Sequence, residues 1–209
     1  MGTYIKIFLQ FPPDQVFWNK TTQFFLYASE IRGYYPLFQS LDHPDFLPGS
    51  GIIFVTVVAE QAYRVELQPD HVTKNEILKV LRNMFGEENV PEPIAFYYPR
   101  WTQTPWSRGS YSNWPTGTTL ETHQNLRANL GRLYFAGEHT ASQMFGFLHG
   151  AYFEGQKAGM KVANCLRYGI CPDDERYESL MGTTMMNEYS PENGWMFDSF
   201  ENYALEGEE

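Results

Sequence analysis

Several signatures of metal-binding and nucleotide-binding proteins are missing from this sequence of 209 residues. It contains no CxxC or HExxH motif, so we expect no metal site. The P-loop GxxxxGK[ST], the GxSxG nucleophile elbow and the dinucleotide-binding GxGxxG turn are also absent. No apolar run approaches the ~18 residues that a transmembrane helix needs. We therefore expect no membrane span.

Positive charge is also scarce, because 15 Lys and Arg side chains stand against 25 Asp and Glu side chains, for a formal net charge of −10. This balance argues against nucleic-acid binding, which needs a basic face. The excess is local: residues 1–171 hold 14 acidic and 14 basic side chains, whereas 172–209 hold 11 acidic side chains and Arg176. We interpret 172–209 as an acidic, largely disordered tail. Its aromatic residues leave open an alternative, a segment that docks on a partner or covers the mouth of a binding site.

What is present in quantity is apolar: 43% of the residues are hydrophobic and 17% aromatic, which excludes disorder of the whole chain. Residues 4–11 alternate as a strand, and 51–59 form an almost continuous β-branched run typical of a central strand. Shorter strands are expected at 23–27, 34–38, 94–98 and 132–136.

Two helices are predicted. The clearer one covers 70–86, where Thr73 and Glu76 have capping-box spacing and Gly86 marks the stop. The other, 149–168, carries glycine and alanine along one side and ends near Gly169. Strands interspersed with helices indicate an α/β fold with α+β character.

Cys165 and Cys171 lie six positions apart, on either side of Gly169. They either form a disulfide across this turn or remain two free buried thiols, and both possibilities stay open. The triplet Asn19-Lys20-Thr21 is an N-glycosylation sequon in a predicted loop. It favours the secretory route for a location that the sequence otherwise leaves unknown.

Lys6 lies in the middle of the first predicted strand, with Tyr4 and Phe8 on the same face. One interpretation is an edge-strand lysine whose ammonium group reaches water. The other is a lysine in an aromatic cavity, whose amine holds a water molecule against an electrophile.

Five segments form an ordered series along the chain: Tyr4-Ile-Lys-Ile-Phe-Leu-Gln-Phe-Pro12, Pro99-Arg-Trp101, Tyr111-Ser-Asn-Trp-Pro115, Tyr134-Phe-Ala-Gly-Glu-His-Thr140 and Gly146-Phe-Leu-His-Gly-Ala-Tyr152. In this order they resemble the flavin-containing amine oxidases, and most closely the secreted plant polyamine oxidases. The resemblance covers residues 3 to about 171.

The resemblance implies the C-terminal part of a two-domain FAD-dependent amine oxidase fold, with a mixed sheet and packed helices. Residues 1–109 resemble the later part of a substrate-binding domain, and 110–171 resemble the closing strand and helix of an FAD-binding domain. The family's N-terminal half, which carries the GxGxxG turn, has no counterpart in this sequence. A missing N-terminal half is therefore an expected partner.

The resemblance also implies three catalytic residues. Lys6 matches the lysine that holds a water at flavin N5, and Tyr111 and Phe147 match the aromatic pair that aligns the substrate amine. The second member of this pair is usually a tyrosine, so Phe147 is a departure that keeps ring stacking and loses a phenol dipole.

The implied contacts with FAD come from further positions. Glu138 matches the acid that bonds the ribityl chain, and Leu148 places a backbone amide at the flavin O2 edge, at the start of a helix. The remaining expected contacts are Trp101, Gly137, Gly146 and Phe147.

The activity expected from the resemblance is oxidation of polyamines of the spermidine and spermine class at a secondary amine. FAD and oxygen take part, and hydrogen peroxide and an aldehyde are the products. Two alternatives stay open. The chain is catalytically silent, because the pyrophosphate of FAD needs the glycine turn that this sequence lacks. Alternatively, the protein is a monoamine or amino-acid oxidase of the same superfamily.

Overall fold

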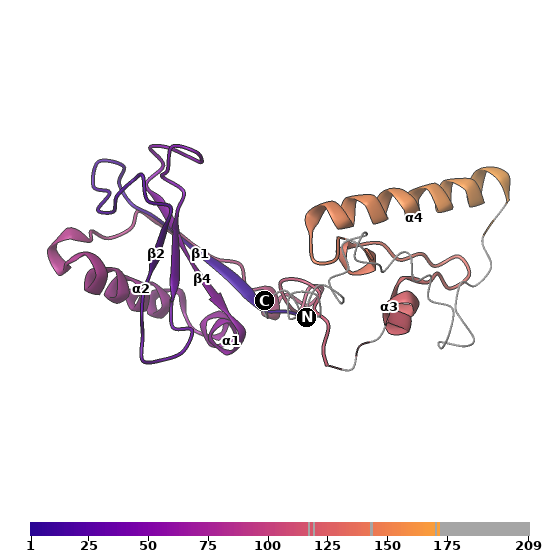
Figure 1. The fold of residues 1–209 in the computed structure, drawn as a ribbon, viewed down its shortest axis with the longest axis horizontal. Helices are drawn as coiled ribbons and strands as arrows, with labels where there is room; N and C mark the ends of the chain where they lie inside the picture. Colours follow the sequence, from indigo (N-terminus) through magenta and orange to yellow (C-terminus); the bar gives the residue numbers. More distant parts are fainter. Residues whose placement is uncertain (117, 119, 143, 170, 172–209) are drawn as a thin grey trace, which may run out of the picture. The chain divides into compact units, whose positions relative to one another are not determined.

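The computed structural model describes residues 1–116, 118, 120–142, 144–169 and 171 (Figure 1). The chain divides into two compact units, of which unit 1 is Met1–Tyr111 and unit 2 begins at Ser112. The acidic tail expected at 172–209 lies outside the described residues. The assignment of 1–109 to a substrate-binding domain and of 110–171 to an FAD-binding domain stays a prediction.

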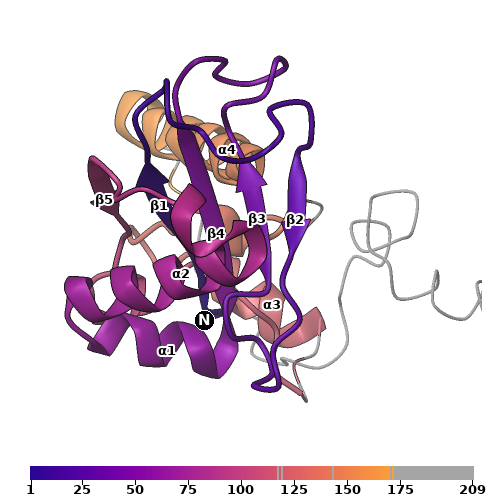
Figure 2. The same cartoon turned by 90° about the vertical axis from the view of Figure 1, so that its left-hand side faces the viewer.

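Unit 1 is built on a five-stranded sheet in the order β2-β3-β4-β1-β5 (Figure 2). Each pairing between the described strands is antiparallel, so this sheet is not the mixed sheet that was expected. The central position of β4 and the alternation of β1 are as predicted. The strands are β1 (Tyr4–Gln10), β2 (Phe24–Leu26), β3 (Leu37–Ser40), β4 (Ile52–Val58) and β5 (Ala95–Tyr97).

Two helices, α1 (Ala59–Leu67) and α2 (Asp70–Phe85), pack on one face of this sheet (Figure 2). Ile5, Ile7 and Leu9 of β1 are fully buried there, in one core cluster with residues of both helices. Removing such side chains from water is the main favourable contribution to the stability of the unit. Short 3-10 turns follow at η1 (Glu87–Asn89) and η2 (Trp101–Gln103).

Helix α2 has the predicted extent but not the predicted cap. Pro69 occupies the N-cap position without a side-chain hydrogen bond, so the capping-box prediction is wrong. Thr73 and Glu76 instead lie inside the helix, where the Gln68 amide donates to both side chains. The Tyr35 hydroxyl and the Arg64 guanidinium also donate to Glu76. Burial alone would raise the pKa of Glu76, but these hydrogen bonds outweigh it and lower the pKa.

Unit 2 contains α3 (Leu120–Arg127), the 3-10 turn η3 (Glu138–Thr140) and α4 (Leu148–Tyr168). Helix α4 ends at Gly169 in the left-handed conformation (φ 66°), as predicted. The strand expected at 132–136 is wrong: the segment holds only an isolated bridge, Leu130 to Leu133. A strand needs a hydrogen-bonded neighbour, and the described part of unit 2 contains no strand with which residues 132–136 could pair.

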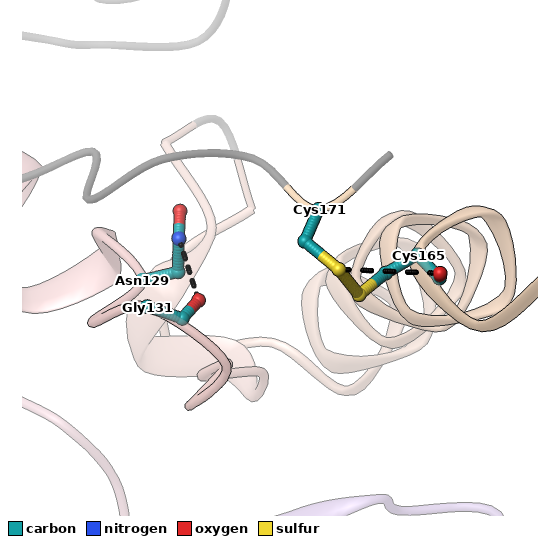
Figure 3. The surroundings of a disulfide bond; sticks show 4 residues. All are labelled: Asn129, Gly131, Cys165 and Cys171. Atoms are coloured by element: carbon teal, nitrogen blue, oxygen red, sulfur yellow. Dashed lines mark hydrogen bonds between the residues drawn. A yellow bond between two sulfur atoms is a disulfide. The ribbon is translucent and has the colours of Figure 1, made fainter. Parts of the chain in front are cut away.

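The two cysteines form a disulfide at the C-terminal end of α4, with Cα atoms 4.3 Å apart (Figure 3). The bond spans the Gly169 turn, which decides between the two states that the sequence left open. Within the described residues, no helix combines the length and apolarity that crossing a membrane requires.

Candidate functional site

Lys6 lies on the face of the sheet opposite α1 and α2. Its partner across the β1–β4 pairing is Thr56, and the next pair on the same face is Phe8 with Phe54. The Lys6 ammonium is 4.6 Å from the centroid of the Phe54 ring and 5.9 Å from that of Tyr4. These distances allow cation–π attraction. Among the described residues, no carboxylate pairs with Lys6.

The pairing of β1 bears on both interpretations of Lys6. Strand β1 pairs with β4 along its whole length but with β5 only at Phe8–Gln10, so on the β5 side Lys6 lies beyond the paired stretch. Lys6 is half-buried and its ammonium lies over aromatic rings, as a lysine in an aromatic environment requires, and the role of its amine stays a prediction. By register, Phe24, Leu26 and Tyr97 lie on the same face of the sheet as Lys6, and their exposed fractions are 49%, 77% and 66%. This face therefore presents exposed apolar and aromatic side chains together with the Lys6 ammonium.

Tyr111 is fixed to the start of the strand that carries Lys6. The backbone N–H of Gly2 donates to the Tyr111 carbonyl at 2.8 Å. A Cβ atom on Gly2 would lie 2.5 Å from the Tyr111 ring, so the close packing of this ring requires glycine. The Ser110 hydroxyl accepts from the Tyr4 N–H at 2.9 Å and donates to the Tyr4 carbonyl at 2.6 Å. The structure thus brings Tyr111 and the Lys6 strand together within unit 1.

Trp101, the third expected residue in unit 1, begins η2 and is partly exposed. The Ser107 hydroxyl donates to its carbonyl at 2.8 Å. Among the described residues, its indole ring makes no ring contact or hydrogen bond with Lys6 or Tyr111.

Glu138 ties two loops of unit 2 together. Its Oε1 accepts the N–H of Ser112 at 2.9 Å and the Ser112 hydroxyl at 2.7 Å, and its Oε2 accepts the N–H of Gly146 at 3.0 Å. A carboxylate has about four acceptor positions, so Oε2 retains one. Ser112 was missed from the sequence, although it lies in one of the resembling segments. The sequence offered one signal for Ser112, a hydroxyl side chain next to Tyr111. The distance of 26 positions between Ser112 and Glu138 gave no reason to connect the two residues.

Two glycines flank this carboxylate, and the backbone φ is positive at both, 156° at Gly137 and 78° at Gly146. A Cβ atom on Gly137 would lie 2.6 Å from the His139 ring. Gly146 has a left-handed backbone (φ 78°) with open space where a Cβ would be, so its requirement for glycine is conformational.

The N-terminus of α4 is open. Phe147 is the N-cap residue and makes no side-chain capping bond. Its ring stacks on His149, with centroids 5.3 Å apart, and is 61% exposed. Leu148 begins the helix and is 89% exposed. First-turn N–H groups have no intrahelical acceptor and carry the positive end of the helix dipole, so they can bind an electron-rich group.

His123 is the one strongly buried histidine among the described residues, at 2% exposure. Its Nε2 is 2.8 Å from the His139 carbonyl oxygen. Burial lowers the pKa of His123, and the neighbouring Arg127 adds to the effect, while the hydrogen bond to His139 opposes it. The described residues do not gather three His, Cys, Asp or Glu side chains in one place.

Comparison with known families shows the class of protein. Residues 1–163 match the family described as flavin containing amine oxidoreductase, so the chain belongs to that family. Over 173 residues it is 42% identical to polyamine oxidase 6 of Oryza sativa subsp. japonica and 41% identical to polyamine oxidase 1 of Zea mays. Each match covers 82% of this chain and 34% of the relative. The chain thus spans about a third of the length of these relatives.

More distant relatives have other names. A possible lysine-specific histone demethylase 1 of Drosophila melanogaster is 30% identical over 177 residues, 78% of this chain and 19% of the relative. Among solved structures, cyclohexylamine oxidase from Brevibacterium oxydans shares the fold with a TM-score of 0.60 and 21% identity, over 79% of this chain and 36% of that one.

Membership in this family implies FAD as the cofactor. The groups described above fit it chemically. Lys6 supplies a cationic donor without a carboxylate partner, Glu138 has one remaining acceptor position for a hydroxyl group, and α4 has an uncapped N-terminus. Lys6, Trp101 and Tyr111 belong to unit 1, whereas the other expected residues, Gly137, Glu138, Gly146, Phe147 and Leu148, belong to unit 2.

Proposed function

We propose that the protein to which this sequence belongs oxidises a polyamine of the spermidine or spermine class at a secondary amine. Water then splits the resulting imine into an aldehyde and a primary amine, and oxygen is reduced to hydrogen peroxide. The observation that carries the proposal is the Lys6 ammonium of β1, which lies over aromatic rings without a carboxylate partner among the described residues. The two polyamine oxidase relatives at 42% and 41% identity support the substrate class.

Residues of unit 1 act on the substrate side of this reaction. FAD, when bound, would supply the redox chemistry, namely the two-electron oxidation of the amine and the return of these electrons to oxygen. The Lys6 ammonium donates a hydrogen bond to a water molecule and orients it. The Tyr111 ring holds the neutral substrate amine by its face. The role expected for Phe147, an aromatic ring that aligns the substrate amine, stays a prediction. Trp101 packs beside the cofactor.

Residues of unit 2 hold the cofactor. The Oε2 atom of Glu138 would accept a hydrogen bond from a ribityl hydroxyl, at the acceptor position that Gly146 leaves open. The Leu148 amide, at the start of α4, would donate to the flavin at the positive end of the helix dipole, which stabilises negative charge. Gly137 and Gly146 keep the backbone free of side chains beside Glu138.

A chimera tests the proposal. The aligned stretch of the rice polyamine oxidase is replaced by that of this chain, and the purified protein is given spermidine, spermine, a monoamine, an amino acid and an Nε-methyl-lysine peptide. Peroxide release measures the rate. We expect the highest kcat/KM for spermidine or spermine. A flavin-loaded chimera that prefers any of the other three substrates overturns the proposed substrate class, and a flavin-loaded chimera without activity supports the catalytically silent alternative.

A further inference from the structure

The sequon Asn19-Lys20-Thr21, which the proposed function does not use, forms an exposed turn in unit 1. The side-chain Oδ1 of Asn19 accepts the N–H of Thr21 at 2.9 Å and the Thr21 hydroxyl at 2.8 Å. The backbone N–H of Thr22 donates to the Asn19 carbonyl at 3.1 Å and closes the turn. The side-chain nitrogen Nδ2 of Asn19 has no hydrogen-bond partner among the described residues.

The residues on both sides of Asn19 hold this turn at the surface. Trp18 is 4% exposed, and its indole N–H donates to the Ser40 hydroxyl at 2.9 Å. The Lys20 ammonium lies 3.2 Å from a carboxylate oxygen of the buried Asp42. Asn19 itself is exposed between these two anchored residues, so its side-chain amide is accessible at the surface.

The disulfide between Cys165 and Cys171 is a second, independent observation. It uses both cysteines of the sequence. Disulfides form and persist in oxidising compartments such as the lumen of the endoplasmic reticulum, where N-glycans are attached. The chain therefore has an exposed acceptor asparagine and a disulfide, and both are typical of proteins that pass through the endoplasmic reticulum.

We propose that Asn19 is an N-glycosylation site. The donor is an oligosaccharide linked through C1 to a lipid diphosphate. The Asn19 Nδ2 atom attacks this C1, a C–N bond forms, the C–O bond to the diphosphate breaks, and the lipid diphosphate leaves with its electron pair. The amide gives up one proton to a base of the transferase. In the structure the Thr21 hydroxyl donates to the Asn19 Oδ1 atom, so the two side chains that define the triplet are in direct contact. Asn19 begins the only Asn-X-Ser/Thr triplet of the sequence.

The test uses the full chain behind a signal peptide and a reporter sequon, translated in the presence of microsomes. The reporter glycan shows that a molecule has entered the lumen. We expect two glycans on the wild-type chain, both removed by peptide N-glycosidase, and deamidation at position 19 in the mass spectrum after removal. Asn19→Gln and Thr21→Ala each lose one glycan, whereas Thr21→Ser keeps both.

Asn113→Gln is the matched control, because Asn113 is exposed but is followed by Trp114-Pro115 and belongs to no sequon. It keeps two glycans. A wild-type chain that carries the reporter glycan alone overturns the proposal, as does an Asn19→Gln chain that still carries two. None of these outcomes depends on flavin binding or amine oxidation.

Discussion

Most of the proposed chemistry of unit 1 depends on the ammonium group of Lys6. Lys6→Met keeps the apolar stem on the β1 strand and removes the charge over the Phe54 ring. Since a positioned proton-transfer or water-holding group contributes roughly 10²–10⁴-fold, we expect kcat of the flavin-loaded chimera to fall by at least ~10²-fold with little change in KM. Stopped-flow absorbance separates flavin reduction from reoxidation. Lys79→Met, at an exposed position of α2, is the control, and equal rates in the two variants would contradict the role of Lys6.

Glu138 is the residue whose carboxylate joins the Ser112 and Gly146 loops. Glu138→Gln keeps its shape but replaces one acceptor oxygen by an NH₂ group that faces N–H donors. Hydrogen bonds to charged groups contribute about 1.5–3 kcal/mol, so we expect unit 2 to lose about that much stability in urea denaturation. Ser112→Ala removes only the hydroxyl bond to this carboxylate and should cost less, about 1.5 kcal/mol. A Glu138→Gln loss no larger than that of Ser112→Ala would contradict the joining role.

At the scale of elements, the glycines of α4 divide into two kinds. A Cβ on Gly150 would lie 2.1 Å from the Met144 carbonyl oxygen, whereas a Cβ on Gly155 or Gly159 meets nothing within 4 Å. In an exposed helix, Gly→Ala stabilises by up to about 1 kcal/mol. We therefore expect Gly155→Ala and Gly159→Ala to raise the melting temperature of the 209-residue chain, and Gly150→Ala to lower it. Differential scanning calorimetry measures the change in melting temperature. A rise for Gly150→Ala would contradict the close packing of the Met144 backbone on α4.

The contact between α3 and η3 makes unit 2 sensitive to acid through His123. Its pKa in the folded state lies below the ordinary 6.5 because the ring is buried. As pH falls below about 6.5, the unfolded chain binds a proton that the folded chain still excludes, so the free energy of unfolding decreases. The decrease ends once pH is below the folded-state pKa. His123→Gln keeps a donor for the His139 carbonyl and should flatten this slope between neutral pH and pH 5. Urea denaturation of both proteins across that range makes the comparison, and parallel slopes would contradict the assignment.

Elements were predictable where a local pattern decides the structure. The buried alternation of β1, the β-branched run of β4 and the apolar face of α2 all appear at the expected places. Helix α1 escaped prediction because it starts directly after β4, at Ala59 with a positive φ of 51°, without any turn residue between the two elements. Residues 132–136 have a strand-like composition, but a strand also needs a neighbour, which composition does not supply.

At the scale of the whole molecule, the candidate site was predictable only through the order of the resembling segments. Spacing placed Lys6 on a strand, but the sequence did not say whether that strand was at an edge, because strand order depends on contacts between distant segments. The carboxylate bond between Ser112 and Glu138 joins residues 26 positions apart. Such contacts follow from packing and not from local periodicity.

The proposed flavin contacts lead to a last prediction. The residues proposed for these contacts would address the ribityl chain and the flavin edge. The pyrophosphate of a dinucleotide is instead bound by a glycine turn at a helix N-terminus, and these 209 residues contain no GxGxxG. Without the contacts to the charged pyrophosphate, we expect the isolated chain to purify without flavin absorbance and to release no peroxide from spermidine, even when FAD is added. The chimera with the rice enzyme, which restores that turn, should be yellow, and its Glu138→Gln variant should retain less flavin per chain. Absorbance spectra of the three proteins at equal concentration decide the matter, since a yellow isolated chain would show that the flavin-edge groups are sufficient to hold the cofactor.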